Sequence, residues 1–143
     1  MSVLRRLVRY HRHRLDEKRR ELRILEERAA AVEGAIESLD NSVVAEQGVA
    51  RRSSEVIGAY GVFARAALDR RATLLGDLSA ANGAVEGARD ALLAAFAEVK
   101  RYEISLKNQE NAEKEALDRR QQGEIDESAL NLFRRRDLGD PVA

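Results

Sequence analysis

The sequence predicts an all-α fold, a long two-helix antiparallel coiled-coil hairpin in which the C-terminal helix is the longer one. A heptad repeat of apolar residues runs through two separate stretches of the chain, and this pattern is typical of coiled coils. The only proline is Pro141, so no proline interrupts residues 1 to 140. Charged residues make up 35% and aromatic residues 4% of the 143 residues, which suits a thin apolar seam better than a thick globular core.

The first helix is expected at about residues 3–52. Its apolar residues recur at alternating steps of four and three, which places them in one seam along the helix. Two seam positions near the N-terminus are polar, His11 and Lys18. The predicted seam consists of Leu4, Val8, His11, Leu15, Lys18, Leu22, Leu25, Ala29, Val32, Ile36, Leu39 and Val43.

A turn is expected at about residues 53–60. The heptad fades after Val43, and the following stretch is rich in glycine and serine, including Gly48, Gly58 and Gly61. Both residue types weaken a helix. The chain is therefore expected to reverse its direction here.

The second helix is expected at about residues 61–136, followed by a frayed tail at 137–143, all within a single coiled-coil domain, 1–143. Gly76, Gly83 and Gly87 fall within this helix, and each costs about 1 kcal/mol relative to alanine. Small residues also allow close approach of two helices, so we expect a tight seam at these glycines. The predicted seam consists of Leu74, Leu78, Ala81, Val85, Ala88, Leu92, Ala95, Val99, Tyr102 and Leu106.

Charges beside the two seams predict an antiparallel arrangement. Each helix is basic in its early part and acidic in its late part. Folding the chain back sets arginines opposite acidic residues at both ends, whereas a parallel pair would set like charges together. The flanking charges are Arg5, Arg12, Arg14, Arg19, Glu26, Glu33 and Asp40 on the first helix and Arg70, Arg89, Glu98, Glu103 and Glu110 on the second.

Composition and motifs argue against an enzyme. The sequence contains no glycine-rich phosphate loop, no nucleophile elbow and no cluster of metal ligands, so neither a catalytic site nor a cofactor is expected. His11 and His13 are two residues apart and point to different faces of a helix, which does not suit a metal site. The absence of cysteine excludes disulfides and thiolate sites and fits a reducing compartment.

The charge balance also disfavours nucleic acid as a partner. The chain has 25 basic and 25 acidic residues, so it is not a general binder of polyanions. The basic N-terminal helix leading into heptads leaves duplex DNA binding as a hypothesis, and steep salt dependence of that binding would support it. No apolar stretch is long enough to span a bilayer, so a cytoplasmic protein is expected.

Three stretches resemble a known family. The first is residues 15–22 (LDEKRREL), preceded by a basic run from Arg5 to Arg14; the second is residues 60–63 (YGVF); the third is residues 125–135 (IDESALNLFRR). In this order they resemble the FliJ family of flagellar type III export proteins, related to the stalk proteins of virulence injectisomes. The resemblance covers about residues 3–136.

The resemblance implies a central stalk-like component of flagellar type III export, and hence a role in flagellum biogenesis and motility. Such a protein binds the hexameric export ATPase ring, promotes its assembly and links it to the cytoplasmic domain of the export gate protein. Contact with export chaperones is also implied, as is peripheral association with the inner membrane through partners only. The alternatives are a coiled-coil export chaperone, a generic adaptor, or the equivalent injectisome stalk.

The resemblance also implies two contact regions. The predicted residues of the gate end are Tyr60 and Phe63. The alternative interpretation is that these two side chains form a local aromatic cluster at the turn. At the ring end, the alternative interpretation of the basic residues is a solvated helical face. The alternative interpretation of the apolar residues is that they pack on the first helix. The ring-end residues are Arg5, Arg6, Arg9, Arg12, Ile125, Leu130, Phe133, Arg134 and Arg135.

Overall fold

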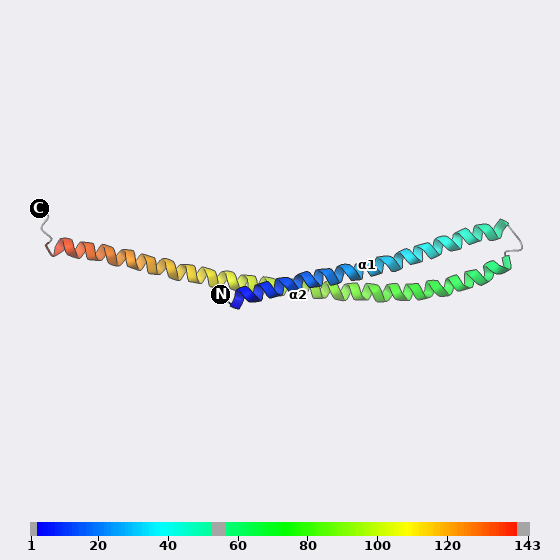
Figure 1. Cartoon of the computed structure of the whole chain (residues 1–143), viewed down its shortest axis with the longest axis horizontal. Helices are drawn as coiled ribbons and strands as arrows, with labels where there is room; N and C mark the ends of the chain where they lie inside the picture. Colours follow the sequence, from blue (N-terminus) through cyan, green and yellow to red (C-terminus); the bar gives the residue numbers. More distant parts are fainter. Residues whose placement is uncertain (1–2, 53–56, 140–143) are drawn as a thin grey trace. The chain divides into compact units, whose positions relative to one another are not determined.

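The computed structural model describes residues 3–52 and 57–139. These residues form two helices, α1 (Val3–Arg52) and α2 (Ile57–Asp137), and no strand (Figure 1). The predicted all-α fold of two long helices that pack against each other is confirmed. Residues 53–56 of the predicted turn and residues 140–143 of the predicted tail lie outside the described residues.

The start of α2 differs from the expected one. The helix begins at Ile57, before the expected start at about residue 61. It therefore includes Gly58, although a glycine inside a helix costs about 1 kcal/mol. Tyr60 and Phe63 are both half-buried, and their packing from the first turns of α2 favours the helix there in spite of the glycines.

A left-handed glycine follows the end of α2. The Leu138 N–H donates a hydrogen bond of 2.9 Å to the carbonyl of Arg134. Gly139 has a φ of 88°, in the left-handed region that commonly terminates helices and that glycine adopts without steric cost. Glycine thus has a specific structural role at this position.

The chain divides into two compact units, which are described separately. One is Tyr10–Val99, and the other combines Met1–Arg9 with Lys100–Ala143. Within Tyr10–Val99 the helices are antiparallel, since ion pairs join Glu26 to Arg89 at 3.9 Å and Asp40 to Arg71 at 2.9 Å. In this unit α1 and α2 run side by side in Figure 1.

The buried residues follow the predicted seams. Every predicted seam position of both helices is buried or half-buried, and Val8 and Val99 are only 3% exposed. The seam also extends beyond its predicted limits, because Ala50 and Ala67 are buried as well. The buried residues are Val8, Leu15, Ala29, Ala50, Ala67, Leu74, Val85 and Val99.

The prediction of a tight seam at the glycines of α2 is wrong. Gly76, Gly83 and Gly87 are all exposed, and a Cβ added at any of them would meet no atom within 4 Å. The reason lies in the heptad itself. Gly76 lies between the seam residues Leu74 and Leu78, so it points away from α1, and the other two glycines also fall between seam positions.

Candidate functional site

The unit that contains both chain ends has a long exposed helical segment. Every described residue from Glu110 to Gly139 is exposed. The predicted apolar contacts lie in this segment, with exposed fractions of 62% for Ile125, 53% for Leu130 and 62% for Phe133. These side chains therefore do not pack back on α1 in the structure. Exposed apolar side chains gathered in one region mark interaction surfaces.

Four residues of this segment form an apolar stripe along one face of α2. Ile125, Ala129, Leu132 and Phe133 follow the i, i+4, i+7, i+8 spacing that aligns side chains on a helix. Two shallow surface hollows meet on this stripe, since Ala129 and Leu132 line both of them. We call these four residues the terminal stripe. Leu130 lies to one side of it.

Leu132 was missed by the sequence analysis, although it is 63% exposed and central to the terminal stripe. The signal was present in the sequence as the helical spacing of Ile125, Leu132 and Phe133. Residue type and place in a family segment point to Ile125, Leu130 and Phe133 but do not show which residues share one helical face.

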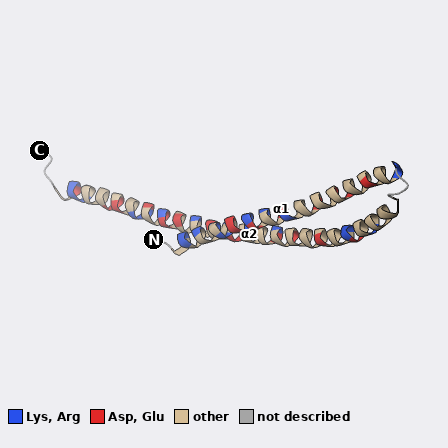
Figure 2. Ribbon diagram, turned by 45° about the vertical axis from the view of Figure 1, so that its right-hand side comes forward, with Lys and Arg blue, Asp and Glu red and all other residues tan. Residues whose placement is uncertain are grey.

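Arginines end the same segment. Arg134, Arg135 and Arg136 occupy the last turn of α2, which is coloured as basic in Figure 2. Positive side chains in the last turn interact favourably with the partial negative charge at a helix C-terminus. The three arginines thus stabilise their own helix and also give this end of α2 a positive surface.

The N-terminal arginines predicted at the ring end are not all equivalent. Arg6 and Arg9 are exposed in the unit that holds the terminal stripe. Arg5 donates a hydrogen bond of 3.3 Å to Oε1 of Glu110 and forms an ion pair with it. Arg12 belongs to the other unit, Tyr10–Val99. The structure thus brings Arg5, Arg6 and Arg9 into one unit with the terminal stripe.

Several charges of α1 interact locally. Arg14 donates a hydrogen bond of 3.3 Å to the Tyr10 hydroxyl, and this bond raises the pKa of the Arg14 guanidinium above its usual value. Arg19 pairs with Asp16 at 3.4 Å on the same helix. Arg14 and Arg19 thus interact along an exposed face of α1, and neither is among the predicted ring-end residues.

The predicted gate-end residues lie together at the start of α2. The rings of Tyr60 and Phe63 have centroids 6.4 Å apart and planes inclined by 39°. Tyr60 also lines a partly open cavity of about 290 Å³ between α1 and α2. Leu39 and Val43 of α1 and the small side chain of Ala64 of α2 contribute to the same cavity.

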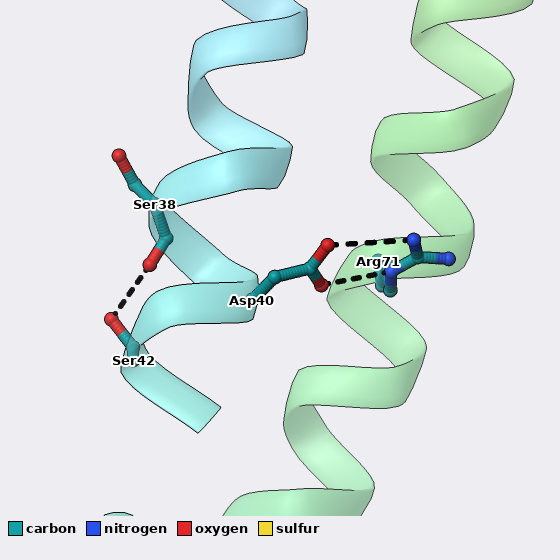
Figure 3. A network of polar contacts seen from close by, with 4 residues as sticks. All are labelled: Ser38, Asp40, Ser42 and Arg71. Atoms are coloured by element: carbon teal, nitrogen blue, oxygen red, sulfur yellow. Dashed lines mark hydrogen bonds and ion pairs between the residues drawn. The ribbon is translucent and has the colours of Figure 1, made fainter. Parts of the chain in front are cut away.

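An ion pair between the helices borders this cavity. Arg71 donates hydrogen bonds from Nε to Oδ1 of Asp40 at 2.9 Å and from Nη2 to Oδ2 at 3.4 Å (Figure 3). The hydrogen bond to Asp40 raises the pKa of Arg71. A raised arginine pKa contributes stability that is fully present below the ordinary arginine pKa, so titration of Arg71 leaves this contribution unchanged across the physiological range. Nearby, the Ser42 hydroxyl donates to the Ser38 carbonyl at 2.9 Å (Figure 3).

A comparison with protein families identifies the chain. The model described as "FliJ: Flagellar FliJ protein" matches residues 1–138. The chain belongs to the FliJ family. This confirms the resemblance and assigns the protein a role related to flagellar type III export. Comparisons with curated proteins and with solved structures give no significant match.

FliJ family members are export components and not a known enzyme family. Within residues 3–52 and 57–139, no three potential metal ligands gather into a site. Neither helix has, over its described residues, an apolar stretch able to cross a membrane. Two features of the described residues suit an interaction, the terminal stripe with its arginines and the aromatic pair at the start of α2.

Proposed function

We propose that this FliJ family protein is the central stalk of the flagellar export apparatus, a coiled-coil hairpin that binds the hexameric export ATPase ring and promotes its assembly. Its other end contacts the cytoplasmic domain of the export gate, and contacts with export chaperones belong to the same role. The protein acts at the cytoplasmic face of the inner membrane, where its partners hold it. The observation that supports this proposal is the exposed apolar and basic end of α2.

The chemistry of that end suits a ring lined with apolar and acidic groups. Ile125 and Phe133 are each 62% exposed, and burying such a side chain fully contributes about 1.5–3 kcal/mol. Aromatic and arginine side chains dominate many protein interfaces. Arg134 and Arg135 would steer the helix toward acidic groups and increase the rate of association.

Titration of the protein into the export ATPase of the same organism tests this proposal, with ATP turnover and hexamer mass followed together. We expect stimulated turnover together with ring formation. Phe133→Ala should raise the concentration needed for half-maximal stimulation by about tenfold, because an exposed aromatic anchor is lost. A matched control is Leu117→Ala, since Leu117 is also half exposed, at 50%, but lies outside the proposed contact.

Two results would contradict the proposal that this protein is the central stalk. If the unmodified protein changed neither turnover nor ring formation, the ring contact would be removed and an export chaperone or adaptor would become the better hypothesis. If Phe133→Ala and Leu117→Ala acted equally, the contact would lie elsewhere on the chain.

The gate contact is tested separately at Phe63. We expect Phe63→Ala to weaken binding to the cytoplasmic domain of the gate protein by about tenfold, measured by calorimetry, because aromatic anchors carry much of the energy of an interface. Val62→Ala is the control, since Val62 is next in sequence and 74% exposed. If Phe63→Ala lowers only the melting temperature and leaves gate binding unchanged, the Tyr60–Phe63 pair is a local cluster.

A further inference from the structure

The terminal stripe does not continue the seam that pairs α2 with α1. The half-buried positions Tyr102, Leu106 and Gln109 end that seam. Carried forward by the same heptad, it would pass through the polar or small residues Glu113, Ala116, Arg120, Gly123 and Glu127 and then reach Leu130. Successive residues of a helix are turned by about 100°, and this places the terminal stripe on nearly the opposite face. A helix that extended the existing seam would leave the terminal stripe uncovered.

The terminal stripe is nearly symmetric about its small central residue. Ile125 and Phe133 each lie four residues from Ala129. If two such segments packed antiparallel about Ala129, Ile125 of each copy would meet Phe133 of the other. The two alanines would meet at the centre and allow the helices to approach closely. Leu132, 63% exposed, would be buried beside them.

Charge along the segment favours the same arrangement. Residues 115–127 contain five acidic and two basic side chains, whereas residues 128–137 contain three arginines and one aspartate. Antiparallel packing about Ala129 sets the acidic part of each copy against the basic part of the other. It also places Arg119 near Asp137 of the second copy. Parallel packing would set arginines against arginines, which is unfavourable.

We infer that the free protein pairs with a second copy of itself through an antiparallel contact of the terminal stripes, centred on Ala129. This inference needs only the exposed stripe and the charges around it. One consequence rests on the proposed function: self-pairing covers Ile125 and Phe133, so a paired chain cannot use them on the ATPase ring. Self-pairing then keeps the apolar surface covered until the ring is available.

Sedimentation equilibrium of the full chain is the first test. Between about 1 μM and 1 mM, a range that brackets weak association, the average mass should rise from 16.0 kDa toward twice that value. Leu132→Glu should weaken the association at least about tenfold, because it buries a charge on each side of the contact. Leu130→Glu is the matched control: Leu130 is 53% exposed, lies to one side of the stripe, and should leave the association nearly unchanged.

Cysteine crosslinking tests the direction of pairing, and the chain has no cysteine of its own. Gln122 and Arg136 each lie seven residues from Ala129 on the side of the stripe, so the antiparallel pair brings Gln122 of one copy near Arg136 of the other. We expect Ala129→Cys to form a disulfide with itself. Gln122→Cys and Arg136→Cys should crosslink when the two variants are mixed and only weakly when each is alone, because a disulfide needs closely approaching Cα atoms.

Three results would overturn the inference. These are a mass that stays at 16.0 kDa at all concentrations, an equal effect of Leu132→Glu and Leu130→Glu, and efficient crosslinking of Gln122→Cys with itself, which indicates a parallel pair. The ATPase titration separates this inference from the stalk proposal. A chain that self-associates through the stripe without stimulating the ATPase supports the former alone, and a monomeric chain that stimulates it supports the latter alone.

Discussion

Leu74→Ala is expected to lower the free energy of unfolding by about 2–4 kcal/mol, the usual range for truncating a buried leucine. Leu74 is 5% exposed and lies in the seam between α1 and α2. The seam is thin, so each buried leucine is a large part of the packing that holds the helices together. Its loss removes apolar burial and leaves a gap that rigid neighbouring helices fill only partly.

The neighbouring leucine provides the control for this experiment. Leu75 is 43% exposed and faces away from the seam, so Leu75→Ala should change stability by less than about 0.5 kcal/mol. Urea unfolding followed by circular dichroism measures both variants under the same conditions. Equal destabilisation by the two variants would mean that the seam of α2 has been assigned to the wrong face.

The seam could be predicted from the sequence because apolar side chains at heptad spacing are typical of one structure, the packed seam between two helices. Leu15, Leu74 and Val85 were all placed correctly by their period alone, and all are buried. The extension of the seam through Ala50 and Ala67 was missed, because alanine occurs equally on packed and exposed helical faces. Arg71 is half-buried and pairs with Asp40 of α1, a contact between helices that the heptad pattern of one helix does not contain.

The direction of pairing could also be predicted, because charge signs complement over the length of the helices. The structure contains two of the expected pairings, Arg5 with Glu110 at 3.3 Å and Glu26 with Arg89 at 3.9 Å. Such exposed ion pairs contribute little to the free energy of unfolding individually. The signs of the flanking charges nevertheless match opposite charges repeatedly, and this distinguishes antiparallel from parallel packing. Charge patterns are therefore informative about topology even where they add little stability.

The candidate contact surfaces were predicted less completely. Ile125 and Phe133 were selected for their residue type, and the structure places them on one exposed face. Leu132 shares that face, whereas Leu130, which stays a predicted contact residue, lies to one side of it. A family segment identifies a region, whereas only the helical rotation of each residue determines which side chains share a face.

The glycines of α2 show the same difference between residue type and helical rotation. Replacing Gly76, Gly83 and Gly87 together with alanine should raise the free energy of unfolding by about 2–3 kcal/mol, since alanine is favoured over glycine by about 1 kcal/mol at each helical position. The added methyl groups meet no atom within 4 Å, so no steric cost opposes the gain. Thermal unfolding followed by circular dichroism would show it as a higher midpoint.

Gly139 is the contrasting position, because its φ of 88° is one that alanine adopts only with strain. Gly139→Ala should therefore give no stabilisation, although open space surrounds that residue too. If the triple variant were no more stable than the unmodified protein, the exposed glycines of α2 would have to be packed against something in solution. A stabilised triple variant that fails to support export would instead show that α2 must bend or unwind at these glycines during its work, because alanine at these positions changes helix stiffness and leaves the seam intact.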